Sequence, residues 1–158
     1  MSKQVNPIPS GYHTITPYLI VRGAAQAIDF YKRAFGAEEV YRLASPDGQS
    51  IWHAEVRIGN SMLMLSEECS NGRSPASLGG TPVHLYVYVE DVDKVFERAV
   101  AAGATVIRPP TDMFYGDRFC ELRDPFGHAW GLATHKEDVP PEELAKRAAA
   151  LMTPGTAT

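Results

Sequence analysis

The chain has 158 residues, of which 44% are hydrophobic and 22% are charged, as expected for one globular domain with a single core. Its formal net charge of −4 argues against nucleic acid and anionic membrane surfaces as partners. No run of about 18 apolar residues is present, and the N-terminal stretch lacks the apolar core of a secretion signal. We therefore expect a cytoplasmic protein in which Cys69 and Cys120 are reduced thiols.

The sequence contains an internal repeat with a period of about 67 residues. An apolar strand ending at Val21 recurs as one ending at Val89, and the glycine Gly36 recurs as Gly103. The pattern Glu-x-Arg that begins at Glu55 recurs at Glu121. Because three types of feature keep nearly one offset, we expect two similar modules that pack against each other.

The first copy is predicted to have the order β-α-β-β-β. Apolar residues spaced three and four apart predict a helix over 24–35 that Gly36 ends. Turn sequences at Ser45-Pro46-Asp47-Gly48 and Gly59-Asn60 separate the later strands. The strands are predicted over 15–21, 38–43, 51–58 and 61–66.

The second copy is predicted to repeat this order. Asp91 is a candidate N-cap for a helix that Gly103 ends, and Asp124-Pro125-Phe126-Gly127 predicts a turn between two strands. A helix is expected from Pro140 and Pro141 to about Met152. The predicted organisation is one domain 1–158, with module one at about 13–68, a linker at 69–81, module two at about 82–135 and a C-terminal helical tail at 136–158.

Strand alternation divides the side chains of the predicted sheets into two faces. The apolar face, expected under the helices, includes Trp52 and Trp130 with the Leu and Val residues in the same alternation. The opposite face combines aromatic, polar and small residues, as a concave ligand-binding sheet does. Its large aromatics lie opposite Ala129, Gly131 and Ala133, which predicts a cavity there, unless residues of a partner subunit fill that space.

These features resemble the vicinal oxygen chelate superfamily, which includes glyoxalase I, extradiol dioxygenases, fosfomycin-resistance enzymes and bleomycin-binding proteins. The resemblance covers roughly Thr14 to His135. The segments from Tyr18 to Gly36, from Phe114 to Arg118 and from Asp124 to Trp130 are similar to the PhnB-like branch. The resemblance implies an α+β fold of two paired β-α-β-β-β modules that form a concave mixed sheet with helices outside, and a homodimer.

The resemblance also implies where a metal would bind, namely on the first and last strands of each copy. By motif register these positions are Thr16, Met64, His84 and Gly131, of which only His84 is a strong ligand. We therefore predict no metal and no cofactor. A metal cluster using His84, Glu55 or Glu121 remains an alternative, and ordinary ion pairs are a second reading of these carboxylates.

The candidate site residues lie on the face opposite the helices, apart from Tyr115, which belongs to the loop 109–116. His84 and Glu121 are the candidate catalytic residues. An imidazole flanked on its own face by Tyr86 and Tyr88 can act as a general base or a hydrogen-bond donor near neutral pH; a structural role for His84 is the alternative. The loop 109–116 is the candidate lid, with a hydrophobic plug or a dimer contact as its other reading. The candidate ligand-binding residues are Tyr18, His53, Glu55, Met64, Tyr86, Tyr88, Tyr115, Phe119 and Gly131.

Two classes of function follow. The first is a binding protein that holds a small aromatic or amphipathic molecule in the concave cavity without a standard metal site. The second is a lyase, isomerase or dioxygenase-type enzyme that uses a non-standard metal site or His84 acid–base chemistry. Such scaffolds carry many chemistries, so the fold alone does not choose between these two.

Overall fold

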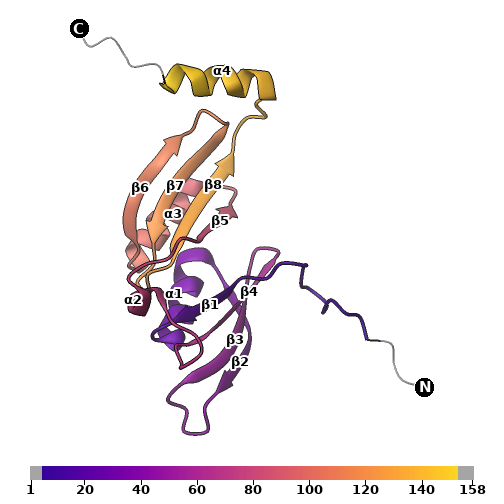
Figure 1. Cartoon of the computed structure of the whole chain (residues 1–158), viewed down its shortest axis with the longest axis vertical. Coiled ribbons are helices and arrows are strands. Elements are labelled where there is room, and N and C mark those ends of the chain that lie inside the picture. Colours follow the sequence, from indigo (N-terminus) through magenta and orange to yellow (C-terminus); the bar gives the residue numbers. More distant parts are fainter. Residues whose placement is uncertain (1–4, 153–158) are drawn as a thin grey trace.

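The computed structural model describes residues 5–152 and contains two modules of the same architecture (Figure 1). The first module consists of β1 (Tyr18–Val21), α1 (Ala24–Phe35), β2 (Glu38–Ala44), β3 (Ile51–Ile58) and β4 (Ser61–Glu67). A short helix, α2 (Pro75–Leu78), follows it. The second module and the C-terminal helix consist of β5 (His84–Tyr88), α3 (Val92–Ala102), β6 (Thr105–Asp112), β7 (Asp117–Arg123), β8 (Ala129–His135) and α4 (Pro141–Met152).

Each module forms a four-stranded mixed sheet, and the two sheets have the same topology. Their strand orders are β1-β4-β3-β2 and β5-β8-β7-β6. In each, the first strand runs parallel to the last, with Tyr18 beside Met64 in one sheet and Tyr86 beside Gly131 in the other. The remaining pairs are antiparallel. The predicted α+β fold of two β-α-β-β-β modules is thus confirmed.

The helices of the two modules, α1 and α3, begin and end where the sequence provides suitable residues. Gly36 and Gly103, with φ of 67° and 118°, take the left-handed conformation that ends a helix. Asp91 caps α3 by accepting a hydrogen bond from the backbone of Lys94. At α1 the Glu67 carboxylate, at the end of β4, accepts from the backbone N–H groups of Gly23 and Ala24 at 2.7 and 2.8 Å. A residue distant in sequence therefore caps this helix, and local reading could not find it.

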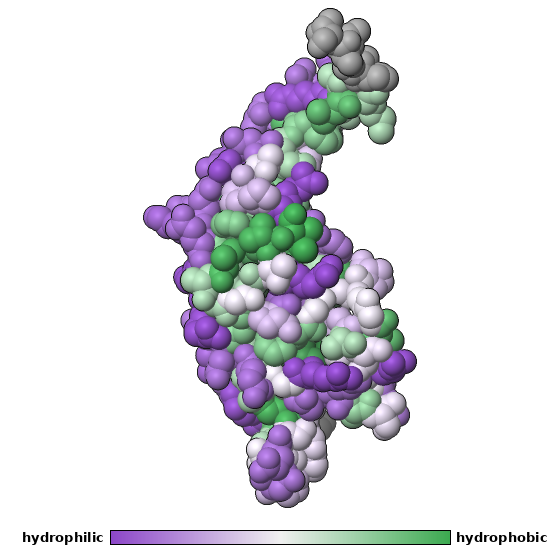
Figure 2. Space-filling view, turned by 90° about the vertical axis from the view of Figure 1, so that its left-hand side faces the viewer, coloured by the Kyte–Doolittle hydropathy of each residue, from purple (hydrophilic) through white to green (hydrophobic). Residues whose placement is uncertain are grey.

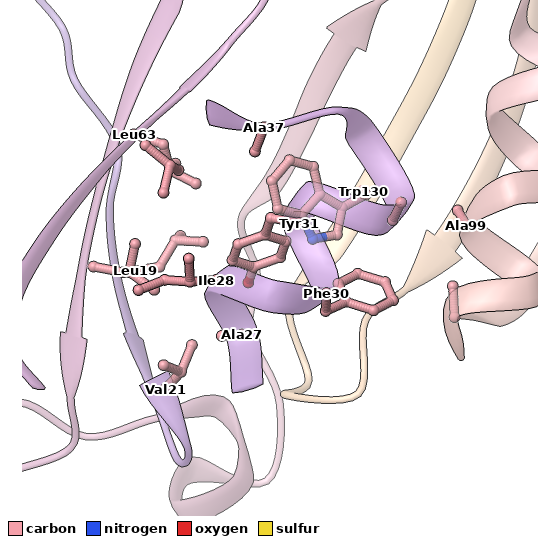
Figure 3. Close-up of a cluster of buried hydrophobic side chains, with 14 of the residues drawn as sticks. Leu19, Val21, Ala27, Ile28, Phe30, Tyr31, Ala37, Leu63, Ala99 and Trp130 are labelled. Carbon is pink, nitrogen blue, oxygen red and sulfur yellow. The ribbon is translucent and has the colours of Figure 1, made fainter. Parts of the chain in front are cut away.

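The core lies where α1 packs between the first sheet and the second module (Figure 3). Tyr31 and Phe35 of α1 contact the indole of Trp130 in β8, with ring centroids 5.3 and 4.5 Å apart. Trp130 is 1% exposed, which agrees with its predicted place under the helices. Because α1 also packs against α3, burial of shared apolar surface holds the modules together.

Several details differ from the sequence predictions. The first strand begins at Tyr18 rather than at residue 15, and the linker contains α2. The predicted core position of Trp52 is wrong, because its side chain is 56% exposed while Ala54 and Val56, in the same alternation, are fully buried. The helices therefore cover only part of β3.

The predicted lid over 109–116 is also wrong as a loop. β6 continues to Asp112 and pairs with β7, with Thr111 beside Phe119 and Asp112 beside Arg118. Only a tight turn remains, closed by a hydrogen bond from the Gly116 N–H to the Met113 carbonyl. The strand accommodates Pro109 and Pro110 because β6 is an edge strand with a register irregularity between Arg108 and Thr111.

Hydrophobic side chains are not confined to the interior. Figure 2 shows a compact hydrophobic area near mid-height, bordered by hydrophilic surface. Several large apolar side chains of the strands are about half exposed, including Tyr41 and Trp52. Within residues 5–152, no helix is long and apolar enough to cross a membrane.

Candidate functional site

The predicted site residues, except Tyr115 in the turn between β6 and β7, lie on the faces of the two sheets that point away from α1 and α3, here called the open faces. Strand alternation places them there, because their neighbours Leu19, Ala54 and Leu132 point into the core. The hydrogen bonds and ring contacts of the predicted residues stay within one module. The structure therefore brings them together as two groups rather than as a single site.

An aromatic surface covers the open face of the second module. The rings of Tyr86 and Phe119 stack with centroids 5.3 Å apart and planes 10° from parallel. Tyr88 lies 5.3 Å from Tyr86 and is 64% exposed. We call Tyr86, Tyr88 and Phe119 the aromatic shelf.

The shelf lies directly on Gly131. A Cβ atom built on Gly131 would be 2.7 Å from Cε2 of Phe119 and 3.2 Å from Cδ2 of Tyr86. The expectation of open space at Gly131 is therefore wrong, because the two rings fill it. Gly131 supports the shelf, and a ligand would meet the outer surface of the rings.

Asp117 fixes two rings of the shelf, those of Tyr86 and Tyr88, through hydrogen bonds to their hydroxyls. Its side chain is 5% exposed and accepts hydrogen bonds from the hydroxyls of Tyr86 and Tyr88 at 3.0 and 3.2 Å. The His135 ring contacts its other oxygen at 2.7 Å. Burial opposes ionisation of Asp117, but these hydrogen bonds outweigh it, so its pKa lies below the ordinary value. Burial, then Tyr115 and Asp117, raises the pKa of Tyr86 well above the ordinary value.

Sequence reasoning missed the roles of Asp117 and His135. Asp117 shares a strand face with Phe119 and Glu121, a period-two signal that places it near the aromatics. His135 is the last residue of β8. No local pattern links the two residues, because they are paired across β7 and β8.

The predicted catalytic pair, His84 and Glu121, also lies on the second open face. Nδ1 of His84 is 3.1 Å from Oε1 of Glu121, and the side chains are 53% and 21% exposed. His84 is on the edge strand β5 and Glu121 on the inner strand β7, with β8 between them. Their contact crosses β8 at Ala129, which has only a methyl group, and Gly131, which has no side chain, and this explains how residues two strands apart can meet.

The open face of the first module holds a hydrogen-bonded series of polar side chains. The Tyr18 hydroxyl lies 3.2 Å from Nδ1 of His53, and Nε2 of His53 lies 3.2 Å from Oε1 of Glu55. Tyr12, in the segment before β1, interacts with the Glu55 carboxylate and lowers its pKa, and His53 adds to this. Met64 is half-buried beside Tyr18.

The donor atoms at the family's metal positions do not fit a tightly bound divalent cation. Thr16, Met64 and Gly131 offer no strong ligand, and His84 is engaged by Glu121. Among residues 5–152 there is no group of three or more His, Cys, Asp or Glu side chains arranged to hold a metal. Whether the protein binds metal stays a prediction that elemental analysis would test.

Comparison with known proteins shows the relationships of the chain. It is 44% identical over 135 residues to an uncharacterized protein of Mycobacterium tuberculosis, covering 82% of this chain and 79% of the relative. It is 28% identical to YjdN of Escherichia coli, covering 78% of this chain and 96% of YjdN.

Two solved structures are also similar to this chain. TioX from Micromonospora sp. ML1 has a TM-score of 0.63 at 28% identity, covering 78% of this chain and 98% of TioX. FosX from Listeria monocytogenes, a fosfomycin resistance protein solved with Mn(II) and a sulfate ion, shares the fold with a TM-score of 0.61 at 23% identity, covering 86% of this chain and 97% of FosX.

The family profile that matches the chain spans residues 11–132, nearly all of both modules. The PhnB-like assignment within the family stays a prediction. The profile match, together with the repeated β-α-β-β-β modules, shows that the chain belongs to the Glyoxalase/Bleomycin resistance protein/Dioxygenase superfamily.

Proposed function

We propose that the protein binds a small planar, aromatic or amphipathic molecule on the aromatic shelf of the second module. The observation that carries this proposal is the shelf itself, in which Tyr86 and Tyr88 stay 44% and 64% exposed although their hydroxyls are tied to the buried Asp117. Rings held in fixed orientation by buried hydrogen bonds lose little entropy when a ligand stacks on them. Aromatic stacking contributes about 0.5 to 1.5 kcal/mol per pair beyond area burial.

The chain is proposed to act as one domain and to form a homodimer. Each open face is a large surface with exposed aromatics, which monomeric proteins rarely leave uncovered. A second copy that covers these faces would enclose the shelf and turn an exposed surface into a cavity. Enclosure would strengthen stacking, because it removes both ligand and rings from water.

Titration with coumarin, a neutral planar aromatic, tests the proposed binding site. We expect amide chemical-shift changes in nuclear magnetic resonance spectra to be concentrated on β5, β7 and β8. Tyr86→Ala and Phe119→Ala should each weaken binding by about two- to tenfold, as loss of one stacked ring implies. Tyr41→Ala, which removes an exposed aromatic from the other module, is the matched control. Perturbations that map elsewhere, or equal affinity in all three variants, would contradict the proposal.

A second candidate function is acid–base catalysis by His84. It is favoured by the contact of His84 Nδ1 with Glu121, which orients the imidazole and leaves Nε2 directed away from that partner. Because His84 is half exposed, His84→Ala should alter the melting temperature little while it removes turnover or binding. A fall of several degrees with unchanged binding would instead identify His84 as structural.

A further inference from the structure

The two open faces are built on the same plan but differ at one chemically decisive position. The strand pairings make Tyr18 equivalent to Tyr86, Met64 to Gly131 and Glu55 to Glu121. Two residues before each glutamate, the first module has His53 and the second has Phe119. Where the second module stacks a phenyl ring on its tyrosine, the first module places an imidazole within hydrogen-bonding distance of it.

The protonation state of this series follows from its geometry. Glu55 is ionised at neutral pH, since the interactions with Tyr12 and then His53 lower its pKa, and an ionised carboxylate only accepts hydrogen bonds. Nε2 of His53 must therefore carry the proton that points to Glu55. In the neutral imidazole Nδ1 is then an acceptor, and the Tyr18 hydroxyl donates to it.

This arrangement leaves the oxygen of Tyr18 able to accept a further hydrogen bond. Tyr18 is 47% exposed, whereas the side chains of His53 and Glu55 are 26% and 22% exposed. The tyrosine is thus the member that a small molecule on the open face would touch. Its two partners lie behind it and are shielded by the neighbouring ring of Tyr41, whose centroid is 6.4 Å from that of His53.

Tyr12 lies beside the carboxylate of Glu55, the member of the series farthest from Tyr18. Its hydroxyl oxygen is enclosed and, within the described part of the chain, has no hydrogen-bond partner of good geometry. Burial, followed by the Glu55 carboxylate, raises the pKa of Tyr12 to about 12, so it stays protonated beside that carboxylate. The buried Tyr12 hydroxyl lowers the stability of the fold unless it interacts favourably with the neighbouring Glu55 carboxylate.

We propose that Tyr18, His53 and Glu55 form a proton relay that removes a proton from a weakly acidic hydroxyl, such as a phenol or an enol, bound to Tyr18. The hydroxyl gives its proton to the Tyr18 oxygen while the Tyr18 proton moves to Nδ1 of His53. The products are the ligand oxyanion, a neutral Tyr18 and an imidazolium held by ionised Glu55, so charge and protons balance. Tyr18 touches the substrate, and His53 and Glu55 act through it.

A chromogenic phenol tests the relay directly. The probe is 4-nitrophenol, whose anion is yellow, at a pH below its own pKa, where the neutral form dominates in solution. Wild-type protein should produce a saturable excess of the anion. His53→Phe, which installs the residue that the second module has at position 119, should reduce this excess by at least about tenfold, as expected for loss of one positioned base. Tyr18→Phe should do the same, and Glu55→Gln should have an intermediate effect.

His13→Phe is the matched control, because it makes the same substitution at an exposed histidine outside the relay; it should behave as wild type. The absence of excess anion in wild-type protein, or equal excess in His53→Phe, would overturn the relay. The result is independent of the aromatic shelf, because Tyr86→Ala tests the shelf in the other module.

A measurement without ligand tests the same assignment. Nitrogen-15 spectra of the imidazole rings should show neutral His53 with its proton on Nε2 only, and a mixture of tautomers in Glu55→Gln. Far-ultraviolet circular dichroism of each variant checks that the sheet is intact. A proton on Nδ1 of neutral wild-type His53 would overturn the proposed direction of the relay.

Discussion

Asp124 shows how one buried side chain joins the two modules. It is 3% exposed, and its carboxylate accepts hydrogen bonds from the Tyr31 hydroxyl of α1 at 2.7 Å and from Nε1 of Trp130 at 2.9 Å. The backbone N–H groups of Phe126 and His128 donate to its other oxygen. Four donors therefore depend on one residue, in a turn whose sequence indicated only a change of direction.

Asp124→Ala should be one of the most destabilising single changes in the chain. It leaves buried donors without a partner at a cost of about 1 to 3 kcal/mol for each group that water cannot reach. We expect a loss of at least about 3 kcal/mol in denaturant unfolding, and about 1 kcal/mol for Tyr31→Phe, which removes one donor. Asp47→Ala, in the exposed turn between β2 and β3 of the first module, should change little. Similar midpoints for Asp124→Ala and Asp47→Ala would rule out this role.

His135 should make the stability depend on pH in a defined direction. Its two ring nitrogens lie 2.7 Å from Asp117 and 2.8 Å from Asp138, and both can donate only when the ring is protonated. Asp117, and then Asp138, raises the pKa of His135 above its ordinary value of 6.5. A raised pKa in the folded state stabilises the fold fully below pH 6.5, and this contribution is lost as the pH rises through the folded value.

The comparison of wild type with His135→Gln measures this contribution. The difference in melting temperature should be largest below pH 6.5 and should shrink as the solution becomes alkaline. Asp117 stays ionised across this range, since its own pKa is lowered. A difference that is constant with pH, or that grows toward alkaline pH, would show that the imidazolium form does not stabilise the fold.

At the scale of elements, β8 provides a flat base for the shelf. Six of its seven residues are buried, and the three that point to the open face are Ala129, Gly131 and Ala133. Small side chains let the rings of Tyr86 and Phe119 approach the strand closely. The shelf is therefore a property of three adjacent strands.

Gly131→Leu should destabilise the protein rather than merely block ligand entry. The new side chain would overlap Phe119 and force its ring to move, and such overpacking typically costs about 1 to 3 kcal/mol. The double variant Gly131→Leu with Phe119→Ala should recover part of the loss, because it removes the ring that the leucine meets. Additive losses in chemical denaturation would indicate that the leucine does not contact Phe119.

Sequence patterns predicted the positions of helices and strands better than they predicted which strand surfaces other parts of the chain cover. The repeat, the cap at Asp91 and the glycines that end α1 and α3 depend on local chemistry, and all are found as predicted. Trp52 follows the correct alternation but lies on a part of β3 that is left uncovered, which no periodicity can reveal. Similarly, the prolines in β6 suggested a loop, because only the sheet order shows that β6 is an edge strand. The site residues were placed on the correct faces, but their partners across strands were not predictable.

At the scale of the whole molecule, the described chain is elongated, with α4 beyond the second sheet at one end (Figure 1). α4 has no buried residue, and Arg147 ties it to Glu137 and to the backbone carbonyl of Phe114, while its pair with Glu143 lies within the helix. Tyr41 and Trp52 on the first sheet remain about half exposed. Such a shape leaves a large surface for a second copy, in agreement with the proposed homodimer.

Sedimentation velocity tests the homodimer and the part that Tyr88, which is 64% exposed on the second open face, takes in it. Stable association buries roughly 1,200 to 2,000 Å² in total, with large aromatics as the usual anchors. We expect wild-type protein to sediment as a dimer and Tyr88→Glu to dissociate, because the substitution places a charge on the open face, where a partner would exclude water. Leu78→Glu, at a 60% exposed position on α2, is the control and should stay dimeric. If wild type is a monomer, or if both variants dissociate alike, neither the homodimer nor the place of Tyr88 within it can stand.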